Sequence, residues 1–193
     1  MKILVTGAKG FVGKNLCAQL NNIMDNKARW YNLPEAIEAV YEYDIDSTHE
    51  QLEEWCKECT FVFNLAGINR PKDPEEFMKG NYGFATTLLN TLKKYGNTCP
   101  VMLSSSSQAA LDNPYGLSKK AGEEVMFQYG QETGAKVLVY RFPNLFGKWC
   151  RPNYNSVVAT FCHNIANGLP IQVNDPSVML NMVYIDDVVD SLI

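Results

Sequence analysis

A tyrosine and a lysine four positions apart, Tyr115 and Lys119, are the residues whose types and spacing best suit chemistry. On a helix, this spacing places both side chains on one face. A phenol with an ordinary pKa of about 10 is a poor acid–base catalyst at neutral pH. A neighbouring ammonium group stabilises the phenolate and lowers that pKa. The pair is therefore suited to exchanging a proton with an oxygen atom of a substrate.

Serine hydroxyls stand close to this pair in the sequence. Four serines, Ser104 to Ser107, directly follow the apolar run 101–103, which predicts a buried strand. A hydroxyl at the end of that strand can hydrogen-bond the same substrate oxygen as the tyrosine. An exposed Tyr–Lys pair on a helix is also common without any catalytic function, so the interpretation depends on the rest of the chain.

A glycine-rich segment follows the first apolar run. Gly7, Gly10 and Gly13 lie between a predicted strand, 2–6, and a predicted helix, 11–24, whose apolar residues recur at helical spacing. In such a strand–turn–helix, the glycines allow a tight turn, a close approach of a pyrophosphate and close helix packing. The helix start adds free N–H groups for phosphates. The segment predicts a dinucleotide site; the alternative is a structural turn with chance glycines.

A nicotinamide dinucleotide held there would deliver a hydride while Tyr115 protonates a carbonyl oxygen. An acidic residue after the second strand favours NAD, and a nearby Arg or Lys favours NADP. Asp44 ends a predicted strand but lies 37 positions after Gly7, more than the roughly 20 expected. It could instead close a third strand and line the adenine. Lys27 and Arg29 lie nearer the expected spacing, so both cofactors remain open.

Composition excludes several classes of protein. The 193 residues are 46% apolar and 20% charged, with a net charge of −4, which is typical of a globular fold. The mild acidity offers no general attraction to nucleic acid or anionic lipid. No apolar run approaches the roughly 20 residues of a membrane span, and the N-terminus does not resemble a signal peptide. We expect a cytoplasmic protein without nucleic-acid or membrane partners.

Cysteines and histidines do not predict a metal site. Cys56 and Cys59 form the single Cys-x-x-Cys among six cysteines, and a structural zinc site needs a second ligand pair. The two histidines, His49 and His163, lie far apart in the sequence. We expect no bound metal and six reduced thiols.

Apolar runs and helical patterns alternate along the rest of the chain. The further predicted strands are 40–45, 61–66, 101–105 and 136–141, and the further helices are 49–58, 81–95, 114–131 and 156–167. This alternation predicts an α/β fold, a Rossmann-like doubly wound parallel sheet with helices on both faces. The nearly continuous apolar strands fit a sheet covered on both sides.

Together these segments resemble the extended short-chain dehydrogenase/reductase family, the NAD-dependent epimerases and dehydratases. The matching runs are TGAKGFVG (6–13), NLAG (64–67), NYGFATTLL (81–89), SSS (104–106), YGLSK (115–119), RFPNLFG (141–147) and VYIDDVV (183–189). They occur in the family's order and span nearly the whole chain. Family members usually dimerise through a helix bundle that includes the Tyr–Lys helix, so the resemblance implies a homodimer.

The resemblance also implies functions for individual residues. The implied catalytic residues are Ser106, Tyr115 and Lys119, with Ser105 or Ser107 as alternatives for the serine. With Asp44 added, the expected cofactor-binding residues are Gly7, Gly10, Phe11, Val12, Gly13, Asp44, Leu65, Ala66, Gly67, Ser104, Tyr115, Lys119 and Pro143. The expected substrate-binding residues are Ser106, Asn144, Lys148, Arg151 and Asn155; the charged members suit a diphosphate. Asn81 is expected to brace the sheet.

A narrower resemblance is to bifunctional enzymes of capsular polysaccharide synthesis. It is carried by LAGINRP (65–71), SSSSQAALDNPYG (104–116) and the long run 141–175. It implies reduction of the C4 ketone of a UDP-4-keto-6-deoxy-N-acetylhexosamine on the route to UDP-N-acetyl-L-fucosamine, and it favours NADPH. In those enzymes a zinc-containing cupin domain follows. We therefore predict a truncated chain: a Rossmann domain at 1–147, then the start of a substrate-binding lobe with the last Rossmann elements at 148–193.

Two other functions remain as alternatives. One is a nucleotide-sugar 4-epimerase or dehydratase with tightly held NAD, although Ser107 and Gln108 stand where dehydratases usually carry Asp-Glu. The other is a non-catalytic dinucleotide-binding module. Such modules commonly lose the tyrosine or the lysine, and this chain has both.

Overall fold

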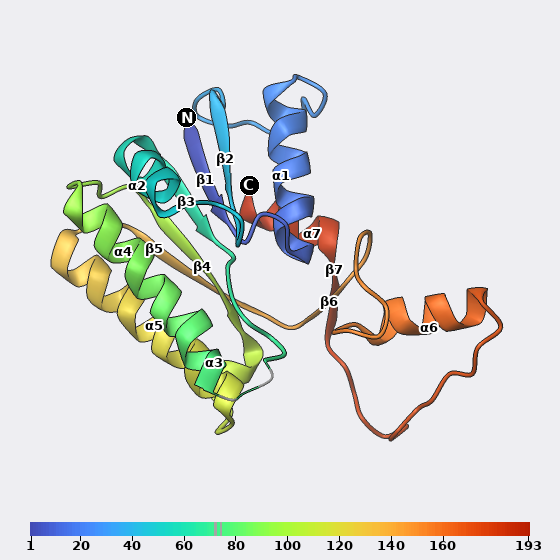
Figure 1. The fold of residues 1–193 in the computed structure, drawn as a ribbon. Coiled ribbons are helices and arrows are strands. Elements are labelled where there is room, and N and C mark those ends of the chain that lie inside the picture. The colour runs from blue at the N-terminus through green and yellow to red at the C-terminus, as the bar shows by residue number, and fades with distance from the viewer. Residues whose placement is uncertain (72, 74) are drawn as a thin grey trace. The chain divides into compact units, whose positions relative to one another are not determined.

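The computed structural model describes residues 1–71, 73 and 75–193, which form two compact units, Met1–Phe142 and Pro143–Ile193. The first unit contains a five-stranded sheet in the order β2-β1-β3-β4-β5 (Figure 1). Its strands are β1 (Lys2–Thr6), β2 (Ala39–Tyr43), β3 (Phe61–Asn64), β4 (Val101–Ser106) and β5 (Val137–Phe142). All neighbouring strands run parallel.

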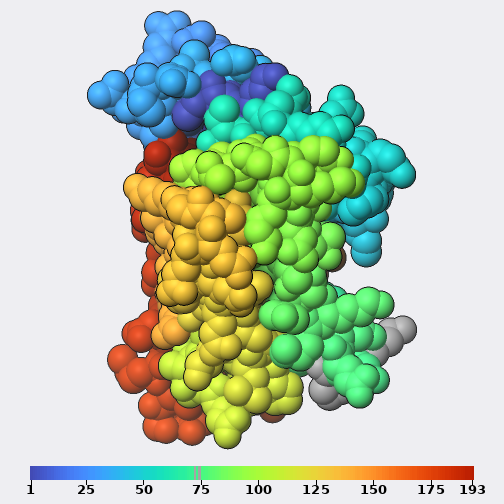
Figure 2. Space-filling view, turned by 90° about the vertical axis from the view of Figure 1, so that its left-hand side faces the viewer, coloured from blue at the N-terminus to red at the C-terminus, as the bar shows by residue number. Residues whose placement is uncertain are grey.

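Helices cover both faces of this sheet. In Figure 1, α1 (Phe11–Met24) lies on one face, and α2 (His49–Glu58), α4 (Phe84–Lys94) and α5 (Pro114–Thr133) lie on the other. Figure 2 shows α4 and α5 side by side. Parallel strands need crossover connections, and the helices that make them bury both faces. The predicted fold class is confirmed. None of the helices in the described part of the chain is long and apolar enough to span a membrane.

The core between the sheet and α2, α4 and α5 holds these helices in place. It contains fully buried side chains from strands and helices alike, among them Leu4, Val62, Val101, Leu52, Leu88, Leu92 and Met126. Burying one such aliphatic side chain is worth about 1.5–3 kcal/mol. The apolar spacing that predicted the helices is therefore also what docks them on the sheet.

The start of α5 positions the predicted catalytic residue Tyr115. Its residue Asn113 caps the helix by accepting a hydrogen bond from the Gly116 N–H at 2.8 Å, and Pro114 occupies the first turn. The helix ends at Gly134, whose φ of 74° is left-handed. Because Tyr115 lies in the first turn, this cap fixes the backbone from which its ring projects.

Several element boundaries differ from the predicted ones. The predicted helix 81–95 begins in a π-helical turn, Met78–Gly83, before α4. The strand β3 ends at Asn64 instead of Ala66: the Leu65 N–H makes the last backbone bond to β1, at the Thr6 carbonyl oxygen, and the Ala66 N–H donates to the Thr6 hydroxyl at 3.3 Å. The helix α3 (Glu75–Phe77) and a 3-10 turn (Ser107–Ala110) are too short to leave a sequence pattern.

The second unit is built around a two-stranded parallel sheet of β6 (Asn144–Phe146) and β7 (Met182–Tyr184). It also contains α6 (Val157–Ala166) and α7 (Ile185–Leu192). The two compact units divide after Phe142, whereas the predicted domain boundary lies after residue 147. The assignment of 148–193 to a substrate-binding lobe stays a prediction.

The close packing of the glycine-rich turn can be tested at Gly13. A Cβ added there would overlap with the Gly7 carbonyl oxygen. An alanine inside a helix normally gains about 1 kcal/mol over glycine, but here we expect Gly13→Ala to lower the free energy of unfolding by roughly 1–3 kcal/mol. Gly83→Ala is the matched control, because the nearest atom to a Cβ there is 3.8 Å away. Equal melting temperatures for the two variants would contradict this packing argument.

Candidate active site

The carboxyl ends of four neighbouring strands meet at one edge of the sheet in the first unit. The glycine-rich turn follows β1, Asp44 follows β2, Leu65–Gly67 follow β3, and Ser104–Ser106 end β4. Ligands of open parallel sheets bind at this edge, where the strand order reverses, here between β1 and β3. The fold thus brings together the predicted cofactor-binding residues of the first unit from positions far apart in the sequence.

The glycine-rich turn has the shape of a phosphate cradle. Gly7 has a φ of 69°, and a Cβ on it would lie 2.7 Å from the Ala66 backbone nitrogen. Gly10 begins α1 and has no side chain to cap it. The first N–H groups of α1, at Phe11 and Val12, are therefore available to an anion.

These features fit a dinucleotide. The turn is too tight for side chains at Gly7 or Gly13, so backbone atoms alone line it at these two positions. At the same edge, the buried Nδ2 atom of Asn64 has no hydrogen-bond partner among the described residues. Leu65 and Ala66 donate their N–H groups to Thr6 and thereby fix the loop that faces the turn.

Asp44 lies directly beside the turn. Its carboxylate accepts hydrogen bonds from the Lys9 N–H at 2.7 Å and the Ile45 N–H at 2.8 Å. The strand before it, β2, is the second in the chain, so the alternative that Asp44 closes a third strand is wrong. The long interval after Gly7 arises from the irregular segment 25–38.

Lys27 and Arg29 do not reach this edge. They follow the C-terminal end of α1, which has 14 residues and is therefore about 21 Å long. Lys27 pairs with Asp25 at 2.8 Å, and Arg29 donates to the Asn26 carbonyl oxygen at 2.9 Å. Sequence spacing suggested them because it does not show that α1 carries the chain to the opposite edge of the sheet.

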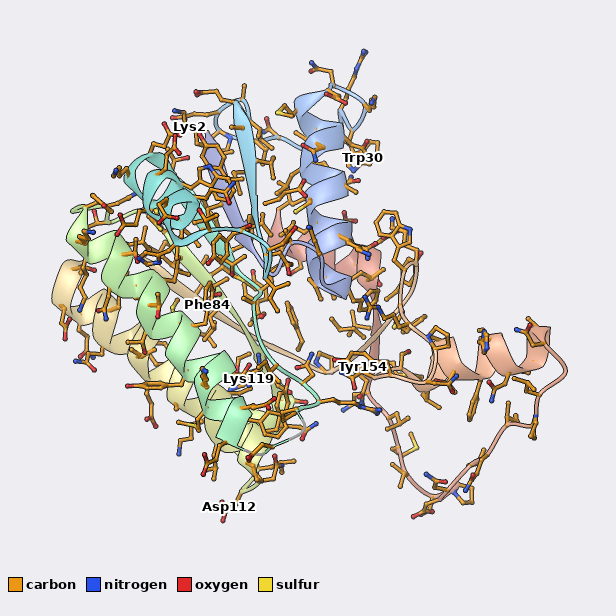
Figure 3. All side chains as sticks on the ribbon, viewed as in Figure 1. Lys2, Trp30, Phe84, Asp112, Lys119 and Tyr154 are labelled. Carbon is orange, nitrogen blue, oxygen red and sulfur yellow. The ribbon has the colours of Figure 1, made fainter. Side chains whose placement is uncertain are left out.

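Two of the predicted catalytic residues, Tyr115 and Lys119, lie in the first turns of α5, and the third, Ser106, ends β4. The Tyr115 hydroxyl donates to Asn69 Oδ1 at 3.0 Å. The Lys119 Nζ donates to the Ser104 carbonyl oxygen at 3.1 Å and lies 5.8 Å from the centroid of the Tyr115 ring. In Figure 3, Lys119 is labelled on α5, and Asp112 marks the loop before the helix. Lys119 is only 7% exposed.

Of the serines, Ser106 is the one that reaches Tyr115. A hydrogen bond with the Ser106 side chain lowers the pKa of Tyr115 and offsets part of a larger rise. The Ser105 hydroxyl instead donates to Glu123 at 2.5 Å, and Ser107 is exposed. Successive residues of a strand point to opposite faces, so the structure favours Ser106 over its two neighbours.

The sequence predicted a lowered pKa for Tyr115, but in the structure this pKa is raised. Burial raises it above its ordinary value. Burial also lowers the pKa of Lys119 to about 8. The expected lowering of the Tyr115 pKa by Lys119 is absent: the lysine Nζ donates its hydrogen bond to the Ser104 carbonyl oxygen and lies over the Tyr115 ring, 5.8 Å from its centroid.

Asn69 is a site residue that sequence reasoning missed. The preceding residue, Ile68, is clamped by Asn81, which accepts from its N–H at 3.0 Å and donates to its carbonyl oxygen at 3.1 Å. Asn81 also donates to Ser118 Oγ on α5 at 2.9 Å. The loop after β3 is thereby fastened to α5, which places Asn69 against Tyr115. Asn81 was expected to brace the sheet, but its hydrogen bonds instead join the loop after β3 to α5.

The sequence analysis also did not identify Glu123, a buried carboxylate behind the serines. It is 4% exposed, and its carboxylate accepts from Arg141 Nε at 2.8 Å and Nη2 at 2.6 Å as well as from Ser105. The Arg141 guanidinium holds the pKa of Glu123 below its usual range. This network joins α5 to β4 and β5 behind the serines. Nothing local in the sequence indicates it, since the partners lie 18 positions to either side.

The remaining predicted site residues lie in the second unit. They are Pro143, Asn144, Lys148, Arg151 and Asn155. Lys148 pairs with Asp186 at 2.8 Å within that unit. Asn144, Arg151 and Asn155 are exposed. The side chains expected to bind a UDP-sugar are thus polar and accessible, except that Lys148 already has a carboxylate partner.

The fold and the site define a class of protein. The chain belongs to the NAD dependent epimerase/dehydratase family, whose model matches residues 3–193. This confirms the resemblance found in the sequence.

Particular relatives are more specific. The chain is 47% identical to a UDP-2-acetamido-2,6-beta-L-arabino-hexul-4-ose reductase of Pseudomonas aeruginosa, over 98% of this chain and 48% of the relative. It is similar to the crystal structure of the capsular polysaccharide assembling protein CapF from Staphylococcus aureus, with a TM-score of 0.81 and 44% identity over 100% of this chain and 49% of that one. A UDP-glucuronate 4-epimerase of Arabidopsis thaliana is 27% identical, over 98% of this chain and 53% of the relative. The chain thus spans about half the length of these relatives.

The buried charge of Lys119 should be measurable as a loss of stability. Its pKa is about 8 in the fold and roughly 10.4 in an unfolded chain. The unfolded chain therefore binds more protons between these values, and the free energy of unfolding rises with pH across that window. We expect Lys119→Met to stabilise the chain at pH 7 by on the order of 2 kcal/mol, and we expect the gain to shrink as the pH rises through 8 to 10.

Denaturant unfolding at several pH values measures this difference. The control is Lys120→Met, because Lys120 is the exposed neighbour on the same helix. A gain for Lys119→Met that does not change with pH would show that the lysine is not destabilised by its buried charge.

Proposed function

We propose that this chain carries the ketoreductase site of a nucleotide-sugar enzyme. In this proposal it reduces the C4 ketone of a UDP-4-keto-6-deoxy-N-acetylhexosamine with NADPH. The observation that carries the proposal is the grouping of Tyr115, Ser106 and buried Lys119 at the sheet edge that also bears the glycine-rich turn. Its substrate class is supported by the 47% identity to a reductase whose name describes an acetamido 4-ulose linked to UDP.

The residues of the site would divide the reaction as follows. When bound, the nicotinamide supplies the hydride for C4. Tyr115 is kept protonated by its raised pKa, as a proton donor must be. Its hydroxyl would turn from Asn69 to the ketone oxygen, and Ser106 would donate to the same oxygen as negative charge develops there. Lys119 would stabilise the phenolate that remains once its Nζ turns from the Ser104 carbonyl oxygen toward that phenolate.

Cofactor binding would use the first unit and the residue that follows it. The proposed contacts to the pyrophosphate are Gly7, Gly10, Phe11, Val12 and Gly13. Leu65, Ala66 and Gly67 would line the adenosine and ribose side, Ser104 and Lys119 the nicotinamide ribose, and Pro143 the carboxamide. Asp44 would lie at the adenosine ribose.

Substrate binding would use Ser106 together with Asn144, Lys148, Arg151 and Asn155. Of these, Lys148 must exchange its partner Asp186 for the diphosphate. A homodimer and a cytoplasmic location remain part of the proposal.

A 4-epimerase that recycles bound NAD is the second candidate. The observation that favours it is the position of Asp44 beside the glycine-rich turn, directly after β2. A carboxylate at that place suits the free ribose hydroxyl of NAD and repels a 2′-phosphate. The choice of cofactor therefore separates the two candidates.

Replacing Tyr115 by Phe tests the catalytic assignment. The variant keeps the ring and its packing but loses the proton, so we expect reduction of the UDP-4-keto sugar to fall by at least about 100-fold with unchanged NADPH affinity. Loss of nicotinamide absorbance measures the rate, and the Pseudomonas aeruginosa reductase serves as the positive control. Reduction by the variant at the unsubstituted rate would refute the assignment.

Paired fluorescence titrations with NADPH and NADH test the choice of cofactor. Under the reductase proposal we expect NADPH to bind more tightly. We expect Asp44→Asn to increase NADPH affinity by about 5- to 10-fold, since removing a unit charge a few ångströms from the 2′-phosphate is worth about 1 kcal/mol. Asp25→Asn, at the far end of α1, is the control. Preference for NADH, reversed by Asp44→Asn, would favour the epimerase.

A further inference from the structure

A pair of thiols lies at the edge of the sheet opposite the candidate active site. Cys59 lies between α2 and β3, two positions before the strand, and Cys99 lies two positions before β4. These strands are parallel neighbours, with Val62 opposite Val101, so the two cysteines meet at the amino ends of the strands. Their Sγ atoms are 3.9 Å apart. The sequence paired Cys59 with Cys56, whereas the fold pairs it with a cysteine 40 positions later.

One asparagine side chain holds the backbone of both cysteines. The Asn97 Nδ2 donates to the Cys59 carbonyl oxygen at 2.9 Å and approaches Cys59 Sγ at 3.6 Å. Its Oδ1 accepts the Cys99 N–H at 2.9 Å. The Asn97 carbonyl in turn accepts the Tyr129 hydroxyl at 3.0 Å, which ties the loop to α5. The two sulfur atoms are therefore held together by structure that packs on the core.

The two thiols differ in access to solvent. An open surface pocket of about 510 Å³ is lined by both cysteines, by Asn97 and by Lys57. Cys99 is partly exposed, whereas Cys59 is 3% exposed. The hydrogen bond between the thiols lowers the pKa of Cys99 and raises the pKa of Cys59. Thiolate character and access thus coincide at Cys99, as they do in cysteines that react first with oxidants.

We propose that Cys59 and Cys99 form an oxidation site that closes to a reversible disulfide when the protein meets a hydroperoxide. The Cys99 thiolate attacks the peroxide, the O–O bond breaks, and Cys99 becomes a sulfenic acid as the peroxide is reduced to hydroxide or alkoxide. The Cys59 thiol then attacks that sulfur, an S–S bond forms, and water leaves with the thiol proton. Two thiols are oxidised by two electrons, and a dithiol reductant restores them.

The disulfide would link two core strands without touching the cofactor edge. It would close a loop between residues 59 and 99, and cross-links of this size restrict the unfolded chain strongly. The glycine-rich turn and Tyr115 lie at the carboxyl ends of the strands. Oxidation should therefore raise thermal stability and leave dinucleotide affinity within about twofold.

Mapping of the oxidised chain tests the proposal directly. The chain is treated with hydrogen peroxide near stoichiometric concentration, unreacted thiols are blocked, and tryptic peptides are analysed without reduction. Cleavage after Lys57 and Lys94 places Cys56, Cys59 and Cys99 in three separate peptides. We expect a linked pair of peptides containing Cys59 and Cys99, a loss of two of the six thiols, and a rise in melting temperature of about 5 °C or more that dithiothreitol reverses.

Variants separate this outcome from general thiol oxidation. In Cys59→Ser we expect a sulfenic acid on Cys99 and no rise in melting temperature. Cys162→Ser, which removes an exposed thiol of the second unit, should behave like the unchanged chain. A disulfide between Cys56 and Cys59, a cross-link through Cys162, or peroxide treatment that leaves Cys99 a free thiol would overturn the proposal. Because the mapping uses the unchanged chain, a variant that fails to fold does not affect the result.

Discussion

The buried ammonium group of Lys119 is the constraint around which the first unit is arranged. Taking this charge out of water lowers its pKa to about 8, so the fold must compensate for it. The Ser104 carbonyl at the end of β4 accepts its hydrogen bond. Gly67 gives it space, since a Cβ there would lie 3.1 Å from the Nζ. The hydrogen bond and this space are what allow the charge to be buried beside the Tyr115 ring.

Tyr115 depends on the same arrangement. The Asn113 cap of α5 fixes the backbone of Tyr115. The loop after β3, which Asn81 holds through its two hydrogen bonds with Ile68, lies against the Tyr115 side chain. The hydroxyl meets Asn69 and Ser106 as a result. A proton donor held between two polar partners, with its proton retained by a raised pKa, is prepared for a carbonyl oxygen that replaces one of them.

The carboxyl ends and the amino ends of the parallel strands carry different groups of residues. Parallel strands collect their carboxyl ends at one edge, where the glycine-rich turn, Asp44 and the serines lie. At the other edge, the amino ends of β3 and β4 bring Cys59 and Cys99 together. Because the apolar strands and the core lie between these edges, chemistry at the thiols can change stability with little effect on the site where a dinucleotide would bind.

The sequence by itself determined the α/β alternation, the glycine-rich turn, the start of α5 and the Tyr115–Lys119 pair. These follow from hydrophobic periodicity, capping residues and spacings within one turn of helix, all of which act over a few residues. Only the tertiary structure shows that Ser106 lies beside Tyr115 while Ser105 turns to Glu123, because these contacts depend on which face of β4 meets α5. The tertiary structure also shows that Lys27 and Arg29 lie far from the glycine-rich turn, that Asn69 contacts Tyr115, and that Cys59 lies next to Cys99. Contacts of this kind join residues tens of positions apart through strand order and helix direction, which no local pattern records.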